Sequence, residues 1–362
     1  MAGSGDVIAV IDADYRVHPD WLRDLVPAFE DPKVALVQAP QDHRDGEESL
    51  LKRLMNAEYA GFFDIGMVQR NEDNAIVAHG TMLMVRRSSF DEVGGWGTDT
   101  ITEDTELGLR LLERGYEARY TNRRYGWGLL PDTYKAFKTQ RHRWTYGAMQ
   151  IMKAHAGKML GNQTKLTFWQ KFHFVAGWLP WFADALHLVF TISAMLWSVG
   201  LLLLPQYFEF PLAVFLFPTL GMFAFKIMHS FVLYTARVPC SLPQRLGAAV
   251  AGMGLTHSIA RAIFAGLFTK GRAFLRTPKG ENSAALVRGL LMAREEGLIL
   301  LALWTCAFGV GSIKLRFGLD VELHEYQAWL SHPRRVQVTR TAPTRRPRPP
   351  SPGRPSPRGA PW

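Results

Sequence analysis

Ile-Thr-Glu-Asp at residues 101–104 and Gln-Arg-His-Arg-Trp at residues 140–144 are the two stretches around which this chain is organised. The first is an acidic turn that could supply a proton acceptor. The second could supply donors for a phosphate and an aromatic platform. The sequence before them is typical of a soluble α/β protein, and most of the sequence after them is typical of a membrane protein.

Composition hides this division. The chain has 362 residues, is 48% hydrophobic and has a formal net charge of +10. Eight arginines and no acidic residues lie in residues 331–362, so the rest of the chain is close to neutral. The basic character therefore does not indicate nucleic-acid binding, although a basic tail could contact anionic lipid. Cys240 and Cys306 lie in or beside apolar runs and cannot form a disulfide framework.

Residues 6–14 read Asp-Val-Ile-Ala-Val-Ile-Asp-Ala-Asp and predict a buried parallel strand whose carboxyl end reaches a site. Such a strand is usually an inner member of its sheet, yet only five residues precede it, so we expect the front of the domain to be missing or the fold to begin unusually. Asp12 and Asp14 would share one face of the strand. They could hold Mg²⁺ or Mn²⁺, which prefer oxygen ligands. The alternative is a solvated turn.

Further elements follow in order. A strand is predicted at residues 34–40, a long helix at 47–70 and a strand at 75–85. The last of these contains His79-Gly80-Thr81, where glycine indicates either close approach of a ligand or a bulge. Thr102 is a predicted N-cap of a helix that runs to about residue 114. Glu103 and Asp104 would then lie in its first turn, where acidic residues also simply complement the helix dipole.

Gln140, Arg143 and Trp144 are spaced to share one face of a helix that ends near them. A glutamine, a guanidinium and an indole in that arrangement could bind a pyrophosphate and stack on a sugar ring. The alternative is an amphipathic helix on lipid, with arginine reaching to water and tryptophan in the interface. The two interpretations are compatible.

Four apolar stretches follow, at residues 185–204, 211–238, 246–268 and 297–313. They contain polar residues at helical spacing, which indicates either a polar translocation path or placement at the membrane interface. The loop between the third and fourth stretches is basic, so it is expected on the cytoplasmic side, as is the α/β domain. From residue 331 the composition changes to Arg, Pro, Ser and Gly, which predicts a disordered tail and suggests a non-native terminus.

Together these motifs resemble those of the membrane-embedded family 2 glycosyltransferases, which include cellulose, hyaluronan and chitin synthases. Asp12-Ala13-Asp14 resembles the Asp-x-Asp motif, and residues 37–40 resemble Val-Gln-Thr-Pro. Thr102-Glu103-Asp104 and Gln140–Trp144 match Thr-Glu-Asp and Gln-x-x-Arg-Trp. Phe274, Thr277 and Lys279 keep part of the gating-loop motif, in which Arg276 replaces Val. The resemblance covers about residues 6–313.

The resemblance implies a GT-A-type (Rossmann-like) α/β catalytic domain that lacks its N-terminal part, followed by an α-helical transmembrane region. Residues 1–145 would be the C-terminal portion of that domain, 146–183 interface helices, and 184–313 transmembrane helices with a gating-like loop at 270–280. Residues 331–362 would be the tail. The protein would lie in a bacterial inner membrane with its catalytic domain in the cytoplasm.

The resemblance also implies roles for individual residues. Asp104 would be the general base, with Glu103 and Thr102 beside it. Asp14 and Asp12 would hold Mg²⁺ or Mn²⁺, and Trp144 would stack under the acceptor. The donor and its diphosphate would contact residues from several motifs, namely Asp12, His79, Gly80, Thr81, Gln140, Arg143, Phe274, Thr277 and Lys279.

The implied activity is inverting transfer of a hexose from a nucleotide sugar, with a UDP-linked donor expected, to a growing polysaccharide at the membrane. Translocation of the product could be coupled to it. His79 stands where cellulose synthases have cysteine, so the product need not be cellulose. The alternatives are a non-processive transfer to a lipid carrier, and an inactive fragment or membrane scaffold. The expected partners are a nucleotide-sugar donor, a glycan or lipid acceptor and membrane lipid, with no nucleic acid.

Overall fold

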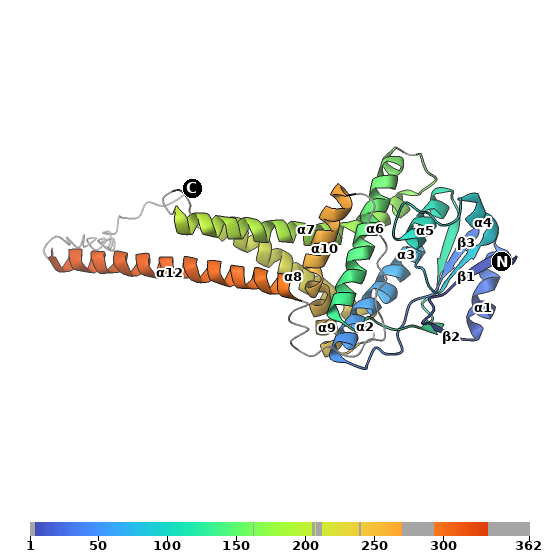
Figure 1. The fold of residues 1–362 in the computed structure, drawn as a ribbon, viewed down its shortest axis with the longest axis horizontal. Helices are drawn as coiled ribbons and strands as arrows, with labels where there is room; N and C mark the ends of the chain where they lie inside the picture. The colour runs from blue at the N-terminus through green and yellow to red at the C-terminus, as the bar shows by residue number, and fades with distance from the viewer. Residues whose placement is uncertain are drawn as a thin grey trace, which may run out of the picture. The chain divides into compact units, whose positions relative to one another are not determined.

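The computed structural model describes residues 4–161, 163–204, 207, 212–238, 240–269 and 293–331. The chain divides into two compact units, Met1–Phe308 and Gly309–Trp362. The first contains an α/β domain and most of the helices that follow it (Figure 1). The described part of the second is the end of helix α12, Arg294–Ser331.

A four-stranded mixed sheet lies at the centre of the α/β domain. Its strand order is β1-β4-β3-β5, where β1 is Val7–Val10, β4 is Leu83–Arg86, β3 is Val34–Gln38 and β5 is Glu117–Tyr120. β4 is antiparallel to both β1 and β3, and β3 is parallel to β5. A second small sheet pairs β2 (Arg16–Val17) with β6 (Gly126–Trp127).

Both faces of the central sheet are covered. Alternate residues of β4 divide between the faces, because Leu83 and Val85 join the larger core and Met84 joins the smaller one. The smaller core is closed by Trp21 of α1 (Asp20–Leu25) and Phe29 of η1 (Val26–Glu30). All residues of β3 are buried, as expected for a strand covered on both sides.

The larger core is covered by helices from several parts of the sequence. They include α2 (Leu50–Gly61), its π-helical continuation η2 (Phe62–Met67) and α5 (Glu103–Glu113). Two shorter helices, α3 (Val68–Glu72) and α4 (Arg87–Glu92), complete the domain. The predicted long helix at residues 47–70 is thus confirmed as one helical run, with a π segment inside it.

Two strand predictions are wrong in their details. The strand predicted at residues 6–14 ends at Val10 and is antiparallel to its neighbour at the end of the described sheet. The strand predicted at residues 75–85 begins only at Leu83. Met82 has a left-handed backbone, with φ of 55°, which a strand cannot pass through. His79-Gly80-Thr81 therefore lies in a loop before β4 and not within the strand.

Helix α6, Tyr134–Leu160, begins at Thr133, whose side chain accepts a hydrogen bond from the Ala136 N–H at 3.1 Å. The sequence predicted that this helix ends near Trp144. It continues to Leu160, since no proline interrupts the residues that follow. The expected domain boundary at residue 145 falls inside this helix. α6 packs along α10 (Thr256–Phe268), and the two helices lie side by side in Figure 1.

The contact between α6 and α10 is close at both of its ends. The Ser258 hydroxyl donates to the Lys138 carbonyl at 3.1 Å. Near the other end, a methyl group placed on Gly266 would lie 2.6 Å from Cβ of Met149. Only glycine therefore fits at residue 266 without moving one of the two helices.

Three described helical stretches are long and apolar enough to cross a membrane: Phe168–Leu203, Leu242–Phe268 and Arg294–Ser312. The first is α7, which starts with a capping box between Thr167 and Gln170. The second comprises α9 (Leu242–Gly254) and α10. The predicted span at residues 211–238 forms α8, Leu212–Arg237. An α/β domain followed by membrane-capable helices is therefore confirmed.

Helices α5 and α6 are joined by a buried ion pair. His155 of α6 lies 2.9 Å from Glu113 and 3.6 Å from Glu106, both on α5. Burial lowers the pKa of His155, but its hydrogen bonds to Glu106 and Glu113 outweigh that effect and raise the pKa to about 9.

Because His155 must be protonated to pair with Glu113 and Glu106, we expect the chain to lose stability at alkaline pH. The folded pKa of His155 lies above its unfolded value of about 6.5, so the contribution is complete below pH 6.5 and disappears as pH rises through about 9. It is worth on the order of 3 kcal/mol at most. Thermal unfolding of the detergent-solubilised chain from pH 6 to 10 measures it. His155→Gln should be less stable than the unaltered chain at pH 6 and similar to it at pH 10; a constant difference would contradict the assignment.

Candidate active site

The N-terminus of α5 presents the acidic turn. Thr102 occupies the N-cap position, as predicted, but its side chain makes no capping hydrogen bond. Its hydroxyl lies 3.2 Å from that of Thr100. A methyl group on Gly147 of α6 would collide with the Thr102 side chain, so glycine at that position allows α5 to start against α6. Glu103 and Asp104 follow in the first turn.

Asp104 is held by backbone groups from two segments. Its carboxylate accepts the Thr105 N–H at 2.7 Å, and the Gly80 backbone also donates to it. The Thr105 hydroxyl donates to the Ala78 carbonyl at 3.1 Å, which fixes the same loop to α5. The structure therefore brings the predicted donor loop, His79 to Thr81, against the predicted base.

The electrostatic environment of Asp104 suits a proton acceptor. Burial raises the pKa of Asp104 to about 6, and nearby Glu103 adds to the shift. The N–H groups of Thr105 and Gly80 oppose it, as does the positive charge of Arg143. A carboxylate with a pKa near 6 is ionised at neutral pH and is a stronger base than an exposed aspartate.

Gln38 fixes the loop at His79 to Thr81, a role that its sequence motif did not reveal. Its side chain is fully buried; Nε2 donates to the carbonyls of Ala39, Thr81 and Met82 at 2.8, 2.9 and 3.2 Å. Its Oε1 accepts the His79 N–H at 2.9 Å. One side chain thus satisfies backbone groups that a neighbouring strand would otherwise pair. This explains why the segment is a loop although its composition resembles a strand.

The His79 ring packs against two phenylalanines. Its centroid lies 5.2 Å from that of Phe62 and 5.4 Å from that of Phe63. Burial lowers the pKa of His79 to about 4, so the ring is neutral at physiological pH. His79 can therefore line a pocket, but it cannot supply a positive charge to a phosphate.

Asp12 and Asp14 lie in a turn after β1. They had been predicted to share one face of a strand, but the strand ends at Val10. The Tyr15 N–H donates to the Asp12 carbonyl at 3.0 Å and closes the turn. The Asp12 N–H donates to the Thr81 hydroxyl at 3.0 Å, and Asp14 Oδ2 accepts the Leu129 N–H at 2.9 Å. The turn is therefore held against the His79 to Thr81 loop, close to the acidic end of α5.

These two carboxylates fit a hard divalent cation only in part. The described ranges contain no group of three or more His, Cys, Asp or Glu side chains that could hold a metal ion. Two oxygen-bearing side chains suit Mg²⁺ or Mn²⁺ where a ligand's phosphates and water complete the coordination, as is common for Mg²⁺. Asp14 and Asp12 would then be the protein's share of the ligands.

Helix α6 presents Gln140, Arg143 and Trp144 on one face, at the predicted spacing. Gln140 Oε1 accepts a hydrogen bond from the hydroxyl of Tyr59 at 2.7 Å, and the Tyr59 and Trp144 rings meet edge to face at 5.9 Å. Burial lowers the pKa of Arg143, while Asp104, Glu103 and Asp12 raise it. Arg143 therefore stands within electrostatic reach of both the acidic turn and the Asp12 turn.

Arg141, which no prediction singled out, supports Trp144. Its guanidinium lies 4.7 Å from the Trp144 ring centroid and 4.8 Å from that of Tyr59, and it pairs with Glu58. Tyr59 was missed as well, since a tyrosine inside an amphipathic helix reads as ordinary core. Phe274, Thr277 and Lys279 lie outside the described residues, so the structure does not place them.

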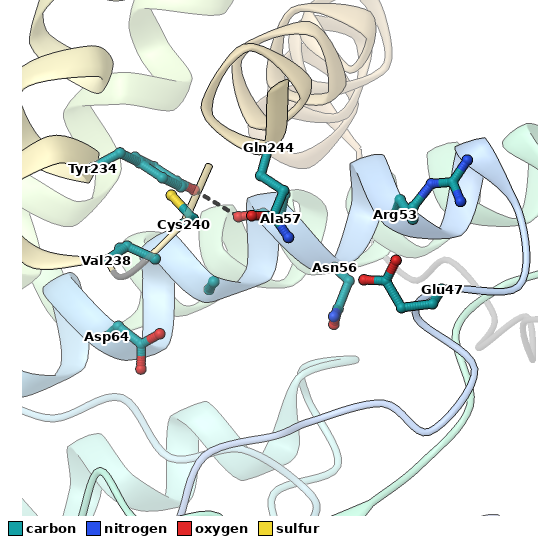
Figure 2. A pocket seen from close by; sticks show the side chains of 10 residues that line it. Glu47, Arg53, Asn56, Ala57, Asp64, Tyr234, Val238, Cys240 and Gln244 are labelled. Atoms are coloured by element: carbon teal, nitrogen blue, oxygen red, sulfur yellow. Dashed lines mark hydrogen bonds between the residues drawn. The ribbon is translucent and has the colours of Figure 1, made fainter. Parts of the chain in front are cut away.

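A separate cavity of about 150 Å³ lies between α2, the end of α8 and α9. Figure 2 shows its lining, with the Tyr234 hydroxyl directed at the Ala57 carbonyl, 2.9 Å away. None of the predicted site residues lines it. The candidate active site is therefore the convergence of the Asp12 turn, the His79 loop, α5 and α6, and not this cavity.

Comparison with known proteins identifies the family of the chain. Residues 7–226 match the model of the family described as glycosyl transferase family group 2. Because this match covers more than half of the chain, the protein belongs to that family. The expectation of a family 2 glycosyltransferase is therefore confirmed.

Several plant proteins are similar to part of the chain. Glucomannan 4-beta-mannosyltransferase 7 of Arabidopsis thaliana is 30% identical over 170 residues, which are 46% of this chain and 30% of that protein. Glucomannan 4-beta-mannosyltransferase 1 of Oryza sativa subsp. japonica is 30% identical over 175 residues, which are 47% and 33%. The chain thus spans about a third of the length of these relatives.

A solved structure also resembles the chain. It is the mannosyltransferase PcManGT from Pyrobaculum calidifontis in complex with GDP-Man and Mn²⁺. The identity is 16% and the TM-score 0.41, over 74% of this chain and 63% of that one.

Proposed function

We propose that this chain transfers a hexose, by inversion, from a nucleotide diphosphate sugar to a glycan acceptor at a membrane. The observation that carries the proposal is Asp104, a buried carboxylate with its pKa raised to about 6, beside Arg143 and the Asp12 turn. In the proposal these groups act as a base, as a cation for a diphosphate and as a pair of carboxylates for a metal ion. The family membership of the chain supports the same reaction class.

Asp104 acts as the general base. It takes the proton of an acceptor hydroxyl, whose oxygen forms a bond to the anomeric carbon of the donor while the bond from that carbon to the diphosphate oxygen breaks. The products are the extended glycan and a nucleoside diphosphate, and the proton stays on Asp104 until water removes it. Glu103 and Thr102 complete the turn that holds Asp104 in position.

The departing diphosphate is bound by α6 and by the two loops. Arg143 offers a fork of donors that matches phosphate oxygens, and Gln140 adds an amide donor. His79, Gly80 and Thr81 line the donor side. Trp144, fixed by Arg141 and Tyr59, provides the ring on which an acceptor sugar stacks.

Asp14 and Asp12 hold Mg²⁺ or Mn²⁺ in this proposal. When bound, the cation neutralises negative charge that develops on the diphosphate. Phe274, Thr277 and Lys279 contribute to donor binding through the basic loop at residues 270–280, an expectation that comes from the sequence.

The donor sugar is proposed to be mannose or glucose, carried by GDP or UDP. Mannose is favoured by the names of the relatives, which are mannosyltransferases. The test is transfer of radiolabel from GDP-mannose and from UDP-glucose, each with Mn²⁺, by the chain in lipid nanodiscs. Incorporation into glycan from either donor supports the proposal. Absence of donor binding would support the alternative of an inactive fragment or membrane scaffold, and product length would separate polymer synthesis from single addition.

The membrane-capable helices extend the proposal to location. We propose an integral membrane protein with its α/β domain on the cytoplasmic side, because the loop at residues 270–280 is rich in Lys and Arg. Residues 146–183 would then lie at the interface, and helices from residue 184 onward would span the bilayer. Membrane lipid is the expected partner there.

A further inference from the structure

We propose that Tyr59 is a positioning residue that determines which end of the Gln140 amide faces the diphosphate of the donor. This inference rests on the proposed function. It concerns a residue in α2, far in sequence from the motif that it serves.

Tyr59 lies at the centre of a cluster that backs the donor-binding face of α6. Its side chain is only 4% exposed, and its hydroxyl meets Gln140 Oε1 at 2.7 Å. Its ring lies 4.9 Å from that of His43 and 5.9 Å from that of Trp144, with the Arg141 guanidinium 4.8 Å above it. Contacts on several sides hold the ring, so the position of the hydroxyl oxygen beside Gln140 is fixed.

The direction of this hydrogen bond determines the chemistry of Gln140. A glutamine amide carries an acceptor at Oε1 and two N–H donors at Nε2, and the two ends have nearly the same shape. Phosphate oxygens are acceptors, so only the Nε2 end binds them favourably. Since the Tyr59 hydroxyl donates to Oε1, Nε2 is the end of the amide that can donate to a ligand.

The protonation state of Tyr59 supports this direction. Burial raises the pKa of Tyr59 to about 12, against the opposing charge of Arg141. The hydroxyl therefore keeps its proton at every pH at which the protein is studied. Without it, the amide could turn over and present Oε1 to the diphosphate, where two acceptors repel each other.

The test measures dissociation constants of GDP and of UDP, each with Mn²⁺, for the full chain in nanodiscs. Tyr59→Phe keeps the ring and removes the hydroxyl, and it should weaken binding about tenfold. Gln140→Leu should weaken it by a similar factor. The double variant should bind no more weakly than Gln140→Leu alone, because Tyr59 acts through Gln140.

A second variant tests the polarity directly. Gln140→Glu has nearly the same shape and still accepts from Tyr59, but it turns the donor end into a charged oxygen. Its affinity should fall by about a hundredfold, more than that of Gln140→Leu. Full affinity of Gln140→Glu would overturn the inference.

Tyr120→Phe is the matched control. Tyr120 is 8% exposed, and its hydroxyl donates to the Phe63 carbonyl at 3.0 Å, away from Gln140. It should leave both dissociation constants unchanged. If Tyr59→Phe weakens binding equally with and without Gln140, or no more than Tyr120→Phe does, this inference is wrong while the proposed function stands. If the unaltered chain binds neither diphosphate, both are wrong.

Discussion

Replacing Asp104 with Asn is expected to lower the rate of sugar transfer by about a thousandfold or more. Asparagine has the same shape but cannot take a proton from the acceptor hydroxyl. The dissociation constant of the nucleoside diphosphate should change little, because in the proposed site Arg143, Gln140 and the Asp12 turn bind that group. Single-turnover transfer and equilibrium binding, measured on the same preparation, separate the two effects.

The control for this variant is Glu72→Gln, which removes an exposed carboxylate at the end of α3. It should leave the transfer rate unchanged. A fully active Asp104→Asn protein would remove Asp104 from the proposed role. Equal loss of transfer and of diphosphate binding would instead indicate that Asp104 supports the site structurally.

The pH profile of the unaltered chain gives an independent check on Asp104. Its pKa is raised to about 6, so the active carboxylate form predominates above pH 6 and is lost as pH falls below it. The value of kcat/KM should therefore rise with pH to a plateau, with its midpoint near 6. A profile that is flat between pH 5 and 8 would contradict this assignment.

Replacing Lys52 with Met is expected to destabilise the α/β domain by about 3–5 kcal/mol. Lys52 lies 2.8 Å from Asp45, 2.9 Å from Glu48 and 2.8 Å from Asp132, and its side chain is 10% exposed. Burial lowers the pKa of Lys52, but hydrogen bonds to Asp132, Asp45 and Glu48 raise it by more. Methionine fills a similar space and leaves buried carboxylates without their cation.

Urea unfolding of the detergent-solubilised chain measures this loss. Arg119→Ala serves for comparison, since it removes one member of an ion pair, with Glu117, whose side chains are 53% and 30% exposed. Exposed pairs of this kind contribute about 0–1 kcal/mol. If the two variants lose similar amounts of free energy of unfolding, the ion pairs of Lys52 contribute no more than an exposed ion pair does. Asp45 also accepts the Leu130 N–H at 3.0 Å, so Lys52→Met should loosen the segment that leads into α6.

The helical part of the site was predictable because spacing along one helix fixes which side chains share a face. Gln140, Arg143 and Trp144 were predicted together for this reason, and α6 presents them together. Thr102, Glu103 and Asp104 were placed correctly at a helix start by the same kind of local rule. Neither rule predicts that α5 and α6 meet. Their contact depends on Gly147, and nothing in the sequence around Gly147 indicated this role.

The strands were predicted less well because their ends depend on partners far away in sequence. The run of β-branched residues after Asp6 continues to Ile11, but β4 pairs with it only as far as Val10. The apolar run from Ala75 resembles a strand, yet the Gln38 side chain takes the backbone groups that a strand would use. Local composition does not show that a distant side chain makes the hydrogen bonds that a neighbouring strand would make.

The close contact of α6 with α10 has a consequence for how the protein senses its surroundings. α10 belongs to a stretch apolar enough to lie in a bilayer, and α6 carries Gln140, Arg143 and Trp144. With Gly266 against Met149 and Ser258 bonded to the Lys138 carbonyl, the two helices cannot slide independently. In the proposed membrane location, a change in bilayer thickness that moves α10 would therefore also move α6, and with it Gln140, Arg143 and Trp144.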